Sequence, residues 1–107
     1  MTFNINEVLA QMSGAIKNEV SDNWSLIKKT TNNFLQSRKA RLELLTSLRL
    51  ENQLSEEFFQ ARLEDEKKIL ASELHAVAVI TKVTAQNAAN AAISILSNAV
   101  KTALGVI

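Results

Sequence analysis

Six carboxylates and one histidine lie close together in the sequence, and these residue types could bind a metal or carry acid–base chemistry. They are Glu56, Glu57, Glu64, Asp65, Glu66, Glu73 and His75. Helical bundles that hold two metal ions use a Glu and a His three residues apart on one helix face. Glu73 and His75 are instead two residues apart, so they point about 200° away from each other on a helix. We therefore expect a solvated, charged helix face with no metal and no cofactor.

Catalysis has equally little support in the residue types. The chain contains no Cys, no Tyr and a single His, and no Gly-rich phosphate loop is present. His75 could in principle act as a general acid or base. Because it stands at the start of an apolar run, we expect it to be a partly buried polar residue instead. The sequence predicts a protein that is not an enzyme.

Two neighbouring segments carry opposite charge. Residues 28–49 hold six bases against Glu43, namely Lys28, Lys29, Lys39, Arg38, Arg41 and Arg49, whereas residues 51–73 hold seven acids against three bases. Nucleic acid is not an expected partner, because the bases lack interleaved aromatics and the acids cancel their field. The charges predict an antiparallel pairing of the two segments, either within one chain or between chains, with Arg49 near Glu57 and Arg41 near Asp65.

The hydrophobic spacing predicts an all-α fold. The sequence has no Pro and two Gly, so helix breakers are scarce. We expect a short N-terminal amphipathic helix over 4–20 and a long antiparallel hairpin with arms at about 22–51 and 55–104. Asn52 can end a helix in the left-handed conformation, and Ser55 can cap the next one. Two alternatives stay open, a continuous helix through 52–55 and a bend near 84–90.

We expect the 107 residues to form a single helical domain in three parts. The parts are the helix at 4–20, a charged hairpin at 22–84 and an Ala-rich apolar helix at 85–107. Large side chains are expected to anchor the core: Trp24, Phe34, Leu45, Phe58 and Phe59. Phe58 and Phe59 point about 100° apart on a helix, so one of them should meet the hairpin partner and the other an intersubunit surface.

The final third of the chain is nearly uncharged. From Ala76 to Ile107 the ionisable residues are Lys82 and Lys101. A polar stripe recurs there at three-and-four spacing: Asn87, Asn90, Ser94, Ser97 and Lys101. Small and apolar residues fill much of the remaining arc: Ala88, Ala91, Ala92, Ile95, Ala99 and Val100. Small side chains let helix backbones approach closely, so this surface suits either a buried bundle helix or a contact between copies of the chain.

No motif identifies a family. The Ala-rich helical composition resembles that of phasins, the amphipathic coats of storage granules, and that of other self-assembling helical proteins. The chain also resembles in outline the small helical hairpins exported by type VII secretion. The Trp-x-Gly turn of those hairpins is absent, because Trp24 is followed by Ser25 and Leu26, and the chain has no Tyr for their export tail.

These patterns lead us to expect a non-enzymatic structural protein. It would self-associate through helix packing into a homo-oligomeric assembly such as a filament, a ring, a shell, or a phage or secretion particle. The physical reason is the Ala-rich end, which is too apolar for water and which a chain this small was not expected to cover alone. A membrane-active or granule-coating helical protein is one alternative, and a small helical adaptor or chaperone is another.

The sequence also gives an expectation for the compartment. No window reaches the roughly 18 unbroken apolar residues of a membrane-spanning helix. The N-terminal segment lacks the basic and apolar regions of a secretory signal. We therefore expect the protein to be cytoplasmic as synthesised, with leaderless export or incorporation into a virion left open.

Overall fold

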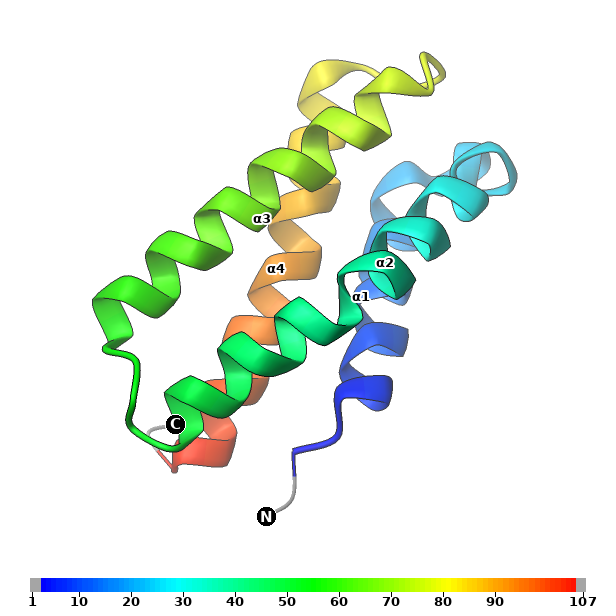
Figure 1. The fold of residues 1–107 in the computed structure, drawn as a ribbon. Coiled ribbons are helices and arrows are strands. Elements are labelled where there is room, and N and C mark those ends of the chain that lie inside the picture. Colours follow the sequence, from blue (N-terminus) through cyan, green and yellow to red (C-terminus); the bar gives the residue numbers. More distant parts are fainter. Residues whose placement is uncertain (1–2, 106–107) are drawn as a thin grey trace.

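Helices account for most of residues 3–105, the part of the chain that the computed structural model describes (Figure 1). In chain order they are α1 (Ile5–Val20), the 3-10 turn η1 (Ser21–Asn23), α2 (Trp24–Leu50), α3 (Glu56–Ala76) and α4 (Lys82–Leu104). No residue in this range belongs to a strand. The prediction of an all-α fold is confirmed. The bundle measures 40 × 24 × 23 Å along its principal axes.

Three of the helices are preceded by a residue whose side chain caps the first turn. Asn4 Oδ1 accepts hydrogen bonds from two amides in the first turn of α1, at 3.0 and 3.2 Å. Ser55 Oγ accepts from the amide of Phe58 at 3.1 Å, and Thr81 Oγ1 accepts from the amide of Thr84 at 3.1 Å. Each cap satisfies an N–H group that has no partner inside its helix. The predicted cap at Ser55 is therefore present.

The chain turns between α2 and α3. Asn52 has a φ of 60°, in the left-handed region that Asn tolerates better than most residues. The amide of Gln53 donates to the carbonyl of Leu48 at 2.8 Å and so satisfies one of the last carbonyls of α2. Of the two alternatives for residues 52–55, the structure has the turn.

A second break divides the arm that was expected to run from 55 to 104. α3 ends at Ala76 and α4 begins at Lys82, whereas residues 84–90, where a bend was considered, are continuous helix. The connecting segment is rich in β-branched side chains, which are poor helix formers: Val77, Val79, Ile80 and Thr81. Ala78 in this segment has a φ of 65°. The chain therefore reverses several residues before the expected position.

α4 folds back onto the bundle, where it contacts α1 most extensively and α3 next (Figure 1). Its buried residues are Ala85, Ala88, Ala89, Ala92, Ile93, Leu96, Ser97 and Val100. From α1, Met12 and Ile16 enter the same core and are fully buried. The expectation that this small chain cannot cover its own Ala-rich end is wrong for the described residues, because α1 and α3 cover it. Val106 and Ile107, the end of the predicted helix, lie outside the described residues.

The expected core anchors have different environments. Phe34, Leu45 and Phe59 are buried and Trp24 is half-buried against the core. Phe58, by contrast, is 60% exposed and does not anchor the core. The buried stripe of α3 passes through Phe59 at three-and-four spacing, so the adjacent residue is turned about 100° away from it.

Candidate functional site

The α4 residues that were expected to form the assembly interface lie within the bundle. Ala88, Ala92 and Val100 are buried, and Ala91, Ile95 and Ala99 are half-buried. Their small side chains serve the close packing of α4 inside one chain. While the chain keeps this fold, the three buried residues cannot contact another molecule.

The expected polar stripe of α4 is divided between solvent and the interior. Asn87, Asn90 and Ser94 are exposed, and Lys101 is half-buried. Ser97 is buried, and its Oγ accepts a hydrogen bond from Nε2 of Gln60 on α3 at 3.0 Å. The stripe thus lies at the polar edge of the contact between α3 and α4.

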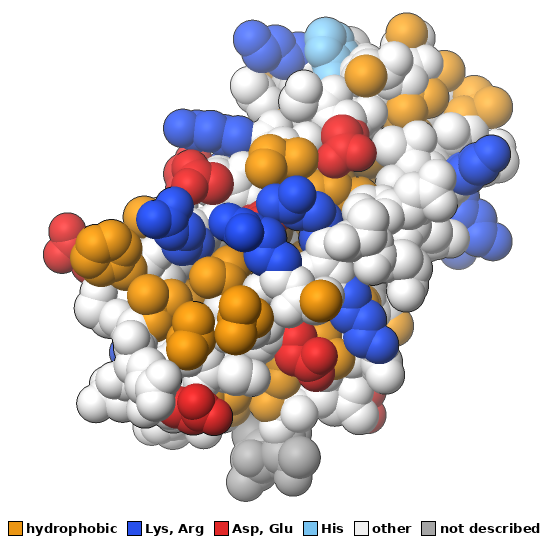
Figure 2. All heavy atoms as spheres, in the orientation of Figure 1, with side chains coloured by type: hydrophobic (Ala, Val, Ile, Leu, Met, Phe, Trp, Pro, Cys, Tyr) orange, Lys and Arg blue, Asp and Glu red, His pale blue; other side chains and the backbone are white. Residues whose placement is uncertain are grey.

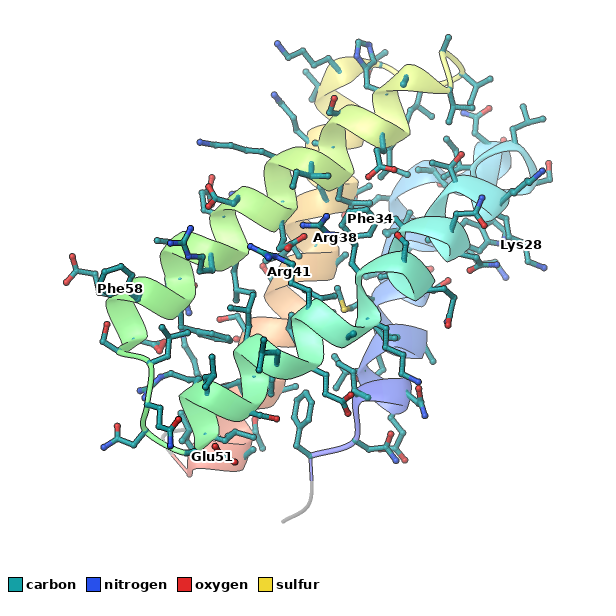
Figure 3. All side chains as sticks on the ribbon, viewed as in Figure 1. Lys28, Phe34, Arg38, Arg41, Glu51 and Phe58 are labelled. Carbon is teal, nitrogen blue, oxygen red and sulfur yellow. The ribbon has the colours of Figure 1, made fainter. Side chains whose placement is uncertain are left out.

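A buried carboxylate joins α2 to α3. Glu66 of α3 accepts from Nε and Nη2 of Arg38, at 2.8 and 2.6 Å, and from Nε of Arg41 at 2.8 Å. Figure 3 shows both arginines reaching from α2 into the space between the two helices. The predicted complementarity of these segments is therefore seen within one chain. Arg41 pairs one residue away from the expected Asp65.

The burial of Glu66 makes its two partners important. Its side chain is 1% exposed, whereas those of Arg38 and Arg41 are 28% and 54% exposed. A buried carboxylate without partners is strongly unfavourable, and a bidentate arginine is its best-matched donor. The hydrogen bond to Glu66 raises the pKa of Arg38 above its ordinary value, with burial opposing the shift. Because the raised pKa belongs to a base, this contribution to stability is complete at neutral pH and is lost as the pH rises into strong alkali.

Sequence reasoning grouped Glu66 with the solvated carboxylates, although its position in the helix carries a signal. The buried apolar residues of α3 are Phe59, Leu63, Leu70 and Leu74. Glu66 fills the gap in this three-and-four pattern, so it belongs to the inward stripe. A carboxylate at an inward position requires a cationic partner, and the basic segment at 28–49 supplies two.

Apolar side chains are exposed on the side of the molecule where Arg41 contacts Glu66. We define the α2–α3 face as Arg41, Leu44 and Leu48 of α2 with Phe58, Arg62, Asp65 and Ile69 of α3. In each helix these residues recur at three-and-four spacing, next to the Arg41–Glu66 contact. Leu44 and Phe58 are 58% and 60% exposed, and Ile69 is 38% exposed. Figure 2 shows hydrophobic side chains gathered around basic ones on this side, and Figure 3 shows Phe58 pointing away from the bundle.

The described residues contain no cluster suited to a metal ion. Within residues 3–105, no group of three His, Cys, Asp or Glu side chains is arranged to hold one. His75 is exposed at the end of α3. In the same range no helix combines the length and the apolarity needed to cross a membrane.

No protein-family model, curated protein or solved structure matches the chain.

Proposed function

We propose that the protein is a non-enzymatic structural subunit that binds a second copy of itself through the α2–α3 face, as the building contact of a homo-oligomeric assembly. The observation that carries this proposal is the exposure of Leu44 and Phe58 on two adjacent helices. Removing apolar surface from water is favourable by about 25 cal/mol per Å². Exposed apolar groups that are rimmed by polar ones are typical of protein interaction sites.

The charges of the face favour a second copy as the occupant. Arg41, Arg62 and Asp65 place both signs on it, with side chains that are 54%, 47% and 57% exposed. In a twofold contact the same patch meets itself, so an arginine of one copy can face Asp65 of the other. The net charge of +1 gives little repulsion between copies.

The ion pairs of Glu66 hold the two helices of the α2–α3 face in a fixed relative position. Because Arg38 and Arg41 both bind Glu66, they fix α2 relative to α3 at the middle of the face. A contact surface whose two helices are held in place loses less conformational entropy on binding. Arg41 also contributes its exposed part to the face itself.

The proposed contact between copies lies on α2 and α3, whereas the sequence predicted it on α4. The α4 residues are used within the chain, so the α2–α3 face takes their place. A membrane-active protein would use the apolar face of α4, and that face is buried within the chain. The α2–α3 face carries exposed charges of both signs beside its apolar groups, which favours a protein partner. An adaptor would use the same α2–α3 face for a different protein.

Light scattering coupled to gel filtration, over a hundredfold dilution series, tests the proposal. The wild-type mass should exceed the 11.8 kDa of one chain and fall towards it on dilution. The double variant Leu44→Ser/Phe58→Ser should remain at the mass of one chain throughout, because it removes the two most exposed apolar groups of the face without touching the core.

Leu26→Ser is the matched control. Leu26 is 58% exposed, like Leu44, but it lies in the first turn of α2 outside the α2–α3 face. This variant should associate as the wild type does. A wild-type chain that stays monomeric at every concentration would refute the proposal, and so would an equal loss of association in Leu26→Ser.

A further inference from the structure

A groove lies between α3 and α4. Its volume is about 560 Å³, within the range of small-molecule sites. Ala71 of α3 lines it with a single methyl group, where a longer side chain would fill the space. The groove is lined by residues of α3 and α4, so it is separate from the α2–α3 face.

The groove is basic. Lys67, Lys68, His75 and Lys82 line it, and Glu64 is the one carboxylate among its lining residues. Glu64 Oε2 lies 2.8 Å from Nζ of Lys67. Lys68 and Lys82 form no ion pair with any carboxylate of residues 3–105. A concave site lined by one sign of charge attracts ligands of the opposite sign.

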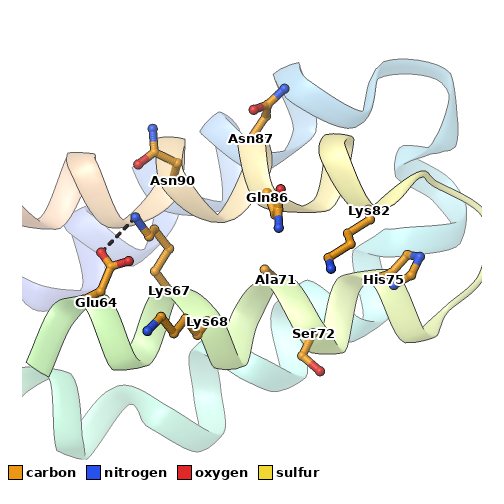
Figure 4. Close-up of a pocket in the computed structure, with 10 residues that line it drawn as sticks. All are labelled: Glu64, Lys67, Lys68, Ala71, Ser72, His75, Lys82, Gln86, Asn87 and Asn90. Carbon is orange, nitrogen blue, oxygen red and sulfur yellow. Dashed lines mark ion pairs between the residues drawn. The ribbon is translucent and has the colours of Figure 1, made fainter.

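The lining side chains come from both helices. Figure 4 shows the ammonium groups of Lys67 and Lys82 at opposite ends of the space between α3 and α4, that of Lys67 beside Glu64, with Gln86 between the two ends. Asn87 and Asn90 add amides along the α4 wall. Lysine has a flexible four-carbon stem, so Lys67 and Lys82 can both swing toward one anion of charge near −2, and neighbouring amides can bind hydroxyl groups of the same molecule. A phosphate monoester meets both conditions, because it carries about −1.5 to −2 charges at pH 7.

We propose that this groove binds a phosphate monoester, with the phosphate between Lys67 and Lys82 and the amides of α4 on the rest of the molecule. Glu64 opposes the phosphate, since its carboxylate repels the ligand and competes for Lys67. Removal of a lysine should therefore weaken the affinity for phosphate, whereas removal of Glu64 should strengthen it. The proposal does not depend on self-association through the α2–α3 face.

Two-dimensional ¹H–¹⁵N NMR at constant ionic strength provides the test, with inorganic phosphate and pyrophosphate as probes and chloride as the reference. Saturable shifts should be confined to amides near residues 64–75 and 82–90. Lys82→Gln should weaken binding about tenfold, as expected for loss of one charge-assisted hydrogen bond. Glu64→Gln should strengthen it a few-fold.

A second basic hollow supplies the control. Ser25, Lys28, Lys29, Asn32 and Asn33 line it, also with lysines and amides, and its volume is about 390 Å³. All of its lining residues belong to α2. Lys28→Gln changes the net charge as Lys82→Gln does, and it should leave pyrophosphate binding unchanged. Equal weakening by both variants, an unaltered affinity in Lys82→Gln, or shifts that grow without saturation across the surface would overturn the proposal.

The phosphate could belong to a soluble molecule or to a lipid headgroup, and a second arm separates these sources. The protein is sedimented with phosphatidylcholine vesicles that do or do not contain phosphatidic acid. Co-sedimentation that requires phosphatidic acid and is lost in Lys82→Gln assigns the phosphate to a lipid. Saturable pyrophosphate binding without co-sedimentation assigns it to a soluble ligand. If neither probe binds, the groove is not a phosphate site.

Discussion

Two hydrogen bonds join Arg38 of α2 to Glu66 of α3, from Nε to Oε2 at 2.8 Å and from Nη2 to Oε1 at 2.6 Å. Residues 28 positions apart in the chain thus form a bidentate pair in the interior. Arg41 adds a third bond to the same carboxylate at 2.8 Å. The buried residues next to Glu66 along α3 are leucines, so this polar contact interrupts an apolar stripe.

Removal of Glu66 should destabilise the bundle more than removal of Arg41. Glu66→Ala leaves Arg38 without its buried partner and should lower the free energy of unfolding by about 2–3 kcal/mol. Arg41→Ala should cost about 0.5–1 kcal/mol, because its side chain is 54% exposed and Arg38 still holds Glu66. Urea denaturation followed by circular dichroism measures both. Glu64→Ala, whose carboxylate pairs at the surface with Lys67, should change stability by less than about 0.5 kcal/mol.

The backbone conformation of Ala78 predicts that a glycine at this position stabilises the protein. Its φ of 65° lies in the left-handed region, which costs an L-residue with a Cβ about 1–2 kcal/mol. Ala78→Gly relieves this cost, partly offset by the greater entropy of unfolded glycine, and should raise the free energy of unfolding by a few tenths to about 1 kcal/mol. Ala61→Gly, at an exposed position within α3, should lower it by about 1 kcal/mol. Thermal unfolding of the two variants should therefore shift in opposite directions.

The close packing of α4 predicts a position-specific effect of larger side chains. Ala92 is fully buried, so Ala92→Leu must force α4 away from its neighbours and should cost about 1–3 kcal/mol. Asn98→Leu, at an exposed position of the same helix, should leave stability nearly unchanged or slightly higher. Similar denaturation midpoints for the two variants would contradict the placement of α4 in the bundle.

Two buried hydroxyls within residues 3–105 have no hydrogen-bond partner, so their removal should stabilise the protein. Among the described residues, Thr31 Oγ1 and Thr46 Oγ1 are buried without a hydrogen-bond partner. Thr46→Val keeps the shape of the side chain and removes the unsatisfied hydroxyl, so it should raise the free energy of unfolding by about 0.5–1.5 kcal/mol. Thr102→Val, an exposed position of α4, provides the control and should have no comparable effect. Urea denaturation of both variants measures the difference, and the midpoint of Thr46→Val should be the higher one.

The sequence by itself determined the class of fold and several helix ends. Three-and-four spacing and the absence of Pro specify helices, because a helix face repeats with the period of its backbone. The turn after Leu50 follows from Asn52 and Ser55, since each acts on backbone groups within a few residues of itself. Charge also indicated the pairing of α2 with α3 to within one residue at Arg41, because opposite charges constrain the register.

Only the tertiary structure decided what covers each helix face. The Ala-rich surface of α4 is suited to any close helix contact, and its own residues do not specify whether α1 or another chain provides it. That choice depends on the path after the break at residues 77–81. The β-branched side chains there favour a break, but long-range packing decides which helices α4 then contacts. The same long-range packing turned Glu66 inward and left Phe58 outside, and it thereby created both the buried ion pairs and the exposed α2–α3 face.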